Sequence, residues 1–188
     1  MSLDLVPVDR EPAAAGAVLL SGIPGSGKST VAAALAARFR MAAHIEVDDL
    51  QHMIASGGQW PSPDANPEAD RQIFLRARNA CLLADSFARA GFLPVLDDVV
   101  VRRSHLDFYR ATLASVPLHV VVLAPGPEEA WRRNQARDKA LDTDWSFLDE
   151  AMRSELAQEG IWIDNAAQSV EETVEAILSA TGLKSAGV

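Results

Sequence analysis

The stretch GIPGSGKS, residues 22–29, constrains this chain more than any other part of its sequence, because it matches the pattern G-x-x-x-x-G-K-[ST]. The apolar residues 17–20 before it predict a strand, and the alanine-rich residues 29–39 after it predict a helix. Glycines in such a turn let successive backbone N–H groups point inward at an anion, and the positive end of the helix adds to the attraction. The stretch therefore predicts a phosphate-binding loop between a strand and a helix.

We expect this loop to bind ATP together with Mg²⁺. In loops of this pattern the lysine, here Lys28, bridges the β- and γ-phosphates, and the hydroxyl of Ser29 is a ligand of Mg²⁺. The residues expected to bind the nucleotide are Gly22, Pro24, Gly25, Ser26, Gly27, Lys28, Ser29 and Thr30.

Five short apolar patterns typical of strands alternate with helical patterns along the chain. This alternation predicts the α/β class, with a five-stranded parallel sheet covered by helices on both faces in a three-layer α/β/α arrangement. Pro94 lies inside the third strand pattern and cannot donate a ladder hydrogen bond, so we expect regular pairing only at Val95 and Leu96. The predicted strands are 17–20, 44–49, 92–98, 118–124 and 161–164, and the main predicted helices are 29–39, 70–90, 104–114, 126–139, 146–157 and one opened by Ser169 and Glu172 as a capping box.

Length and charge limit the classes of protein to consider. A chain of 188 residues suits one domain, 1–188, with residues 1–16 as a loose N-terminal lead-in. The net charge of −9 argues against long nucleic acid as a partner. The lone cysteine, Cys81, and the lack of a signal-peptide pattern predict a cytoplasmic protein, and the lack of a long uncharged apolar run predicts no membrane span.

Polar residues end three of the predicted strands, where ligands of open parallel sheets bind. Asp48 and Asp49 close the second strand pattern, Asp97 and Asp98 close the third, and Asp164 and Asn165 stand at the end of the fifth. One carboxylate could hold Mg²⁺ while another accepts a proton from an attacking hydroxyl. We prefer Asp48 as the base and expect Asp97 or Asp98 to serve the metal. Asp49 has an alternative interpretation as a helix N-cap, and the Asp97–Asp98 pair as a simple turn.

These motifs resemble small-molecule kinases of the nucleoside-monophosphate-kinase-like P-loop group, most of all the chloramphenicol phosphotransferase-like branch. The resemblance is carried by GIPGSGKST, by strands ending in VDDL and LDDVV, and by an Arg-x-x-x-Arg helix after the fourth strand. It implies the strand order 2-3-1-4-5 and transfer of the γ-phosphoryl group of ATP to a hydroxyl. It also implies that Asp48 deprotonates that hydroxyl.

The resemblance further implies a helical lid at about 126–145, whose arginines, Arg133 and Arg137, close over the phosphates. Because these residues are four apart, they share one face of a helix, where their guanidinium groups could grip a phosphoryl group. The alternative is that the segment is an ordinary solvated, charged helix face.

The acceptor pocket should be formed by the segment between the second and third strands. Trp60 is there either as an aromatic wall or as a loop anchor packed on the core. Arg71, Arg76 and Arg78 are more typical of solvated side chains than of ligands, and Arg102 is better placed after the aspartate pair. The candidate substrate residues are Asp48, Trp60 and Arg102.

The sequence therefore predicts an ATP-dependent kinase with a small hydroxylated acceptor, because no basic stripe with interleaved aromatic residues marks a nucleic-acid substrate. Two alternatives remain open. One is a P-loop ATPase or regulatory protein in which Asp48 orients water, and the other is a nucleotide-dependent binding protein without phosphoryl transfer. The sequence predicts neither the oligomeric state nor the identity of the acceptor.

Overall fold

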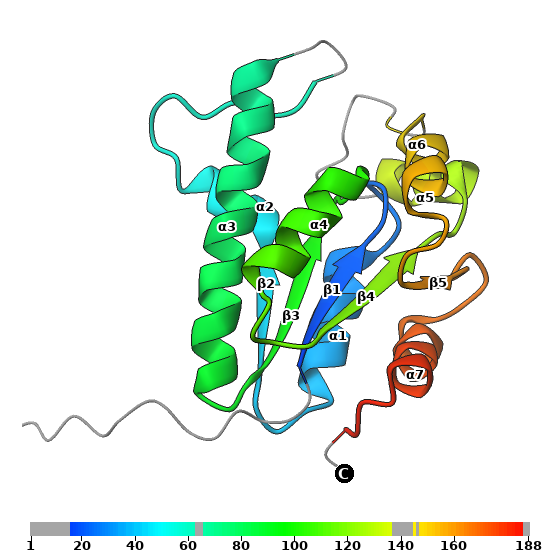
Figure 1. The fold of residues 1–188 in the computed structure, drawn as a ribbon. Helices are drawn as coiled ribbons and strands as arrows, with labels where there is room; N and C mark the ends of the chain where they lie inside the picture. The colour runs from blue at the N-terminus through cyan, green and yellow to red at the C-terminus, as the bar shows by residue number, and fades with distance from the viewer. Residues whose placement is uncertain (1–15, 63–65, 137–144, 146, 186–188) are drawn as a thin grey trace, which may run out of the picture.

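One sheet of five parallel strands forms the middle layer of the protein (Figure 1). The computed structural model describes residues 16–62, 66–136, 145 and 147–185. The strand order β2-β3-β1-β4-β5 and the parallel pairing confirm the predicted sheet. The strands are β1 (Ala17–Ser21), β2 (Ala42–Glu46), β3 (Leu93–Asp98), β4 (Leu118–Leu123) and β5 (Ile161–Ile163).

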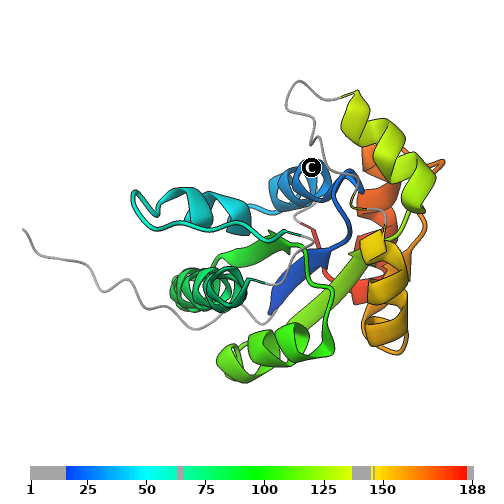
Figure 2. The same ribbon diagram turned by 90° about the horizontal axis from the view of Figure 1, so that it is seen from above.

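Helices cover both faces of this sheet, and Figure 2 shows α3 and α4 on one side with α1 on the other. None of the helices in the described part of the chain is long and apolar enough to cross a membrane. The helices are α1 (Lys28–Ala37), α2 (Val47–His52), α3 (Pro67–Arg89), α4 (Arg103–Thr112), α5 (Pro127–Gln135), α6 (Phe147–Leu156) and α7 (Val170–Thr181).

The two faces of the sheet each bury their own core because neighbouring strand residues point to opposite sides. Leu19 packs with residues of α3, α4 and α6, while Leu20 packs with residues of α1 and α7. Both side chains are completely buried. Since burial of a leucine contributes about 1.5–3 kcal/mol, the apolar strands fix the sheet between the two helical layers.

Pro94 does not prevent β3 from pairing on both sides, so the expectation of regular pairing only at Val95 and Leu96 is wrong. The N–H of Leu93 donates to Met41 O on the β2 side, so the nitrogen of the next residue faces β1. Pairing with β1 begins only at Val95, which lies opposite Val18. The missing N–H of Pro94 therefore falls just before the β1 ladder and leaves it intact.

One helix begins earlier than predicted, and one strand ends earlier. Helix α3 begins at Pro67, three residues earlier than expected, because the Asn66 side chain accepts hydrogen bonds from two N–H groups of its first turn. The strand predicted at 44–49 ends at Glu46, and Asp48 and Asp49 lie in the first turn of α2. Carboxylates are favourable at that position. Since Glu46 is the N-cap of α2, the N-cap interpretation of Asp49 is wrong.

Candidate active site

A cavity of about 360 Å³ lies at the carboxyl ends of the central strands. It is lined by the turn between β1 and α1, by Asp48 of α2, by Asp97 and Val99 at the end of β3, and by Arg133 of α5. The structure thus gathers residues from four separate segments around one space. The lining residues from this turn and from the first turn of α1 are Pro24, Gly25, Gly27, Lys28, Ser29 and Thr30.

The turn adopts a backbone that needs glycine. Gly25 has φ +85°, and a Cβ atom placed there would lie 2.0 Å from the carbonyl oxygen of Ala130 in α5. Gly27 has φ +95° and is the N-cap of α1, so the first N–H groups of that helix face the cavity end of the turn. Asn165, which follows β5, donates from Nδ2 to Ser26 O at 3.0 Å and holds the turn from outside. This cradle fits a phosphate group.

Ser29 and Asp97 meet at the cavity, where Ser29 Oγ donates to Asp97 Oδ1 at 3.2 Å. A hydroxyl and a carboxylate oxygen are the donors that Mg²⁺ prefers, and Mg²⁺ commonly takes only one or two protein ligands beside substrate phosphates. The donor set therefore fits this ion. Lys28 extends from the same turn, and its Nζ donates to Ile23 O at 3.3 Å.

Asp97 has a second partner that sequence reasoning missed. Nε2 of His44, in β2, lies 2.5 Å from Asp97 Oδ2. This hydrogen bond raises the pKa of His44 above 6.5, against the opposing effect of its partial burial. The only signal in the sequence was a histidine inside a mostly apolar strand pattern. The pairing of β2 with β3 brings this histidine close to Asp97.

Asp98 faces the opposite side of the sheet from Asp97, as neighbouring strand residues must. Its side chain is fully buried and accepts hydrogen bonds from Tyr109 Oη at 2.9 Å and from the Val99 N–H at 2.8 Å. It does not line the cavity. Of the two aspartates predicted for the metal, the structure brings only Asp97 to Ser29.

Asp48 projects into the cavity with 56% of its side chain exposed. Arg76 of α3 donates from Nη1 to Asp48 Oδ1 at 2.9 Å. The pKa of Asp48 is raised, chiefly because the surrounding protein removes water from the carboxylate, while Arg76 opposes the rise. Arg76 itself is only 6% exposed, so its interpretation as a solvated side chain is wrong.

Arg133 reaches the cavity from α5 and is held there by three hydrogen bonds. Its Nε donates to Glu129 Oε1 at 2.6 Å, and its Nη2 donates to the carbonyl oxygens of Asn165 at 2.8 Å and Ala166 at 2.9 Å. These contacts join the predicted lid helix to the segment after β5. Arg137 lies outside the described residues.

Trp60 and Arg102 do not line the cavity. The Trp60 ring lies 5.9 Å from the Arg76 guanidinium and 5.0 Å from the His52 ring, with 46% of the residue exposed. The backbone carbonyl of Arg102 begins α4 by accepting hydrogen bonds from its first turn, and its side chain is exposed. Trp60 therefore lies next to Arg76, the partner of Asp48, whereas Arg102 lies away from these residues and from the cavity.

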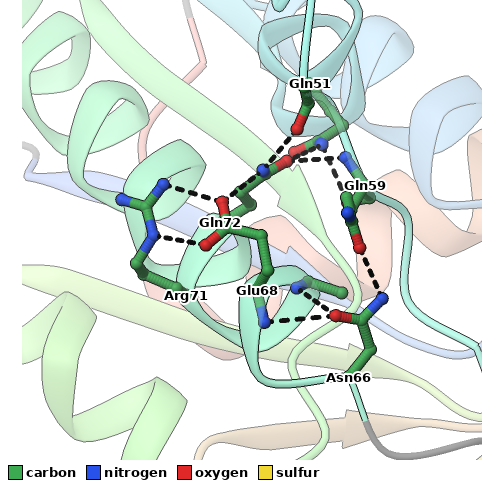
Figure 3. Close-up of polar contacts among 8 residues, drawn as sticks. Gln51, Gln59, Asn66, Glu68, Arg71 and Gln72 are labelled. Atoms are coloured by element: carbon green, nitrogen blue, oxygen red, sulfur yellow. Dashed lines mark hydrogen bonds and ion pairs between the residues drawn. The ribbon is translucent and has the colours of Figure 1, made fainter.

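The loop that carries Trp60 is fixed by buried amides, which Figure 3 shows. Gln51 of α2 donates to Gln72 Oε1 at 2.8 Å and to Gln59 O at 2.9 Å. Gln72 of α3 accepts from the Gln59 N–H at 2.7 Å and donates to Gly57 O at 2.9 Å. The residue before Trp60 is thus tied to two helices by glutamine amides. Trp60 itself is exposed and packs in neither core of the described residues, so its interpretation as a loop anchor packed on the core is wrong.

A family model described as AAA domain, AAA_33, matches residues 18–159. The chain belongs to this family. The match includes the phosphate-binding turn, Asp48, both aspartates of β3 and Arg133. No curated protein matches this AAA domain.

Several solved structures share the fold of this AAA domain at low sequence identity. A sugar kinase from Janibacter sp. HTCC2649 has TM-score 0.64 and 19% identity over 89% of this chain and 94% of its own. The tunicamycin resistance protein of Deinococcus radiodurans has TM-score 0.67 and 18% identity over 93% and 99%. The Mycobacterium tuberculosis APS kinase CysC, in complex with AMPPNP and APS, has TM-score 0.66 and 17% identity over 92% and 100%.

Proposed function

We propose that this protein is an ATP-dependent phosphotransferase that moves the γ-phosphoryl group to a hydroxyl of a small molecule. One observation carries the proposal: the Asp48 carboxylate opens into the same cavity as Lys28 and Ser29 of the phosphate-binding turn. A proton acceptor beside a phosphate cradle is the arrangement that phosphoryl transfer to a hydroxyl requires. The kinases among the similar folds support this choice.

In the proposed reaction, the acceptor oxygen forms a bond to the γ-phosphorus as the bond between that phosphorus and the β,γ-bridging oxygen of ATP breaks. The hydroxyl proton passes to Asp48, and ADP leaves. The raised pKa of Asp48 suits this role, because a base is most effective when its pKa lies nearer the working pH. Lys28 and Arg133 would neutralise charge on the phosphates.

Mg²⁺, if bound between Ser29 and Asp97, would neutralise phosphate charge. His44 would hold the second Asp97 oxygen, since the ligands of metal ions are themselves commonly fixed by hydrogen bonds. Asp98, buried on the other side of β3, does not reach the proposed metal site. We therefore assign the metal role to Ser29 and Asp97.

For the acceptor we retain the chloramphenicol phosphotransferase-like branch, that is, a hydroxylated small molecule. Trp60 offers an aromatic face close to the Asp48–Arg76 pair, on a loop that buried amides hold in place. Flat aromatic surfaces of this kind pack well against the rings of small ligands.

The test is turnover of Mg–ATP by the purified protein, alone and with a panel of hydroxylated small molecules, with products identified by mass spectrometry. Lys28→Ala should abolish turnover, and Asp48→Asn should lower acceptor phosphorylation about a hundredfold or more. Asp49→Asn is the matched control, because Asp49 lies next to Asp48 on α2 but is 71% exposed and outside the cavity lining.

Normal phosphorylation by Asp48→Asn would refute Asp48 as the base. Turnover that no compound stimulates, and that still depends on Asp48, would instead favour the ATPase alternative in which Asp48 orients water.

A further inference from the structure

Arg76 is a buried cation that joins the cavity to the core. Its side chain extends from the middle of α3, and Figure 1 shows that helix running beside α2. Its Nη1 donates to Asp48 Oδ1 at 2.9 Å, and its Nη2 donates to Asp98 Oδ1 at 3.3 Å. A guanidinium group is planar and can bind two carboxylates at once without changing its shape. Arg76 therefore ties a half-exposed carboxylate to a fully buried one.

Asp98, the buried carboxylate that Arg76 contacts, is held firmly by its neighbours. Asp98 has no exposed side-chain surface and is held by the hydroxyl of Tyr109 at 2.9 Å and by the Val99 N–H at 2.8 Å. Tyr109 is itself completely buried in α4. His105 Nε2 lies 3.3 Å from Asp98 Oδ2, the oxygen that accepts from Tyr109. Asp98 thus fixes the guanidinium from the core side.

Asp48 is the half-exposed carboxylate that Arg76 contacts. It lies in the first turn of the short helix α2, where its side chain has room to change rotamer because it is half-exposed. Arg76 contacts only Oδ1, and within the described part of the chain no hydrogen bond is made to Oδ2. Oδ2 is therefore open toward an incoming hydroxyl while Oδ1 is held.

We propose that Arg76 is a positioning residue for phosphoryl transfer, which holds the Asp48 carboxylate toward the cavity and is itself anchored by Asp98. The inference rests on the proposed role of Asp48 as the base. In this arrangement Asp98 anchors Arg76 and takes no part in the chemical step, in place of the metal-binding role expected from the sequence.

Electrostatics support the same role. The charged groups that act on Asp48 are Arg76 from α3, Asp97 and Asp98 from β3, and Lys28 from α1. The two aspartates and the loss of water raise the pKa of Asp48, while Arg76 and Lys28 lower it. Of the two cations, Arg76 has the larger effect on Asp48, so it opposes the rise in pKa and favours the ionised carboxylate, which is the form that can accept a proton.

A different role for Arg76 would be to bind an anionic group of the acceptor. Both terminal nitrogens already donate to carboxylates, and the Trp60 ring lies 5.9 Å from the guanidinium carbon. The side chain is only 6% exposed, which leaves little surface of the guanidinium for an acidic acceptor to reach. The contacts therefore favour the positioning role, and the two roles have different consequences for variants.

The test compares Arg76→Lys with Arg78→Lys, the matched control on the exposed face of the same helix. Lysine keeps the charge but cannot bridge two carboxylates with a planar fork. We expect Arg76→Lys to lower kcat for Mg–ATP turnover about tenfold to a hundredfold, both alone and with the panel compound that stimulates it most, with KM for ATP unchanged. Arg78→Lys should match the wild type.

A second variant removes the charge without leaving Asp98 unpaired, since a single buried charge without its partner is strongly destabilising. In Arg76→Met with Asp98→Asn, the pKa of Asp48, followed by ¹³C NMR of the carboxyl carbon, should rise above its value in Asp98→Asn. The single variant is the reference because Asp98 itself raises the pKa of Asp48, and the Asp48→Asn spectrum assigns the signal.

Three results would overturn the inference. The first is an unchanged kcat in folded Arg76→Lys, and the second is an unchanged Asp48 pKa in the double variant. The third is a rise in KM confined to acidic panel compounds, which would make Arg76 an acceptor-binding residue. If Asp48→Asn keeps full turnover, the proposed function fails instead, and the NMR titration still reports whether Arg76 acts on Asp48.

Discussion

Replacing Gly25 by alanine should damage both the stability of the protein and its nucleotide site, because the phosphate-binding turn touches α5 at this residue. The Cβ atom of an alanine would lie 2.0 Å from Ala130 O and 2.8 Å from the carbonyl carbon of the same residue. Both atoms belong to the backbone of a helix, so no side-chain rotation can relieve the contact. The turn and α5 would have to separate by about 1 Å to reach a tolerable distance.

The cost has two parts. An alanine at φ +85° adopts a left-handed backbone, which costs about 1–2 kcal/mol. Forcing packed segments apart costs typically about 1–3 kcal/mol more. The sum, about 2–5 kcal/mol, corresponds to a fall in Tm of roughly 4–20 °C for a chain of this size.

Gly182→Ala is the matched control. Gly182 ends α7 with φ +70°, and a Cβ atom placed there meets nothing within 4 Å. It should therefore lose only the conformational part, about 1–2 kcal/mol, or roughly 2–8 °C in Tm.

The assay is thermal unfolding by circular dichroism, without and with Mg–ATP. Gly25→Ala should have the lower Tm of the two variants and should gain less from Mg–ATP than Gly182→Ala, since ligands stabilise only the state that binds them. Equal Tm values for the two variants would refute the close approach of the turn to Ala130. An unchanged gain from Mg–ATP would refute the turn's role in binding.

Further variants test other parts of the structure. Asn66→Ala removes the N-cap of α3 and should cost about 1 kcal/mol in urea unfolding, whereas Asn79→Ala on the exposed face of that helix should cost nothing. Tyr109→Phe leaves a buried oxygen of Asp98 without its donor and should cost about 1–3 kcal/mol in the same assay. His44 has a raised pKa in the folded state, so its ionised form stabilises the protein fully below pH 6.5, and this contribution is lost as the pH rises through the raised pKa. The free energy of unfolding of His44→Gln, measured without Mg²⁺, should therefore differ most from the wild type at low pH and should approach it at high pH; a constant difference would contradict the ion pair.

The sequence alone determined the features that depend on residues close together in the chain. The spacing of Gly22, Gly27 and Lys28 predicts the phosphate-binding turn, and the alternation of patterns predicts the α/β class. The capping box of Ser169 and Glu172 is confirmed at the start of α7. Turn conformations and helix caps are decided by a few neighbouring residues, so their signals are present in a short stretch of sequence. The strand order came from the family resemblance, because periodicity does not say which strands are neighbours.

The tertiary structure alone decided which polar residues meet. Asp97 and Asp98 are adjacent in the sequence, yet one meets Ser29 and His44 at the cavity while the other is buried against Arg76 and Tyr109. The pleat of β3 sends the two carboxylates to opposite faces, and their partners come from elements far away in the chain. Such contacts depend on strand register and on the packing of helices over the sheet, neither of which leaves a local pattern in the sequence.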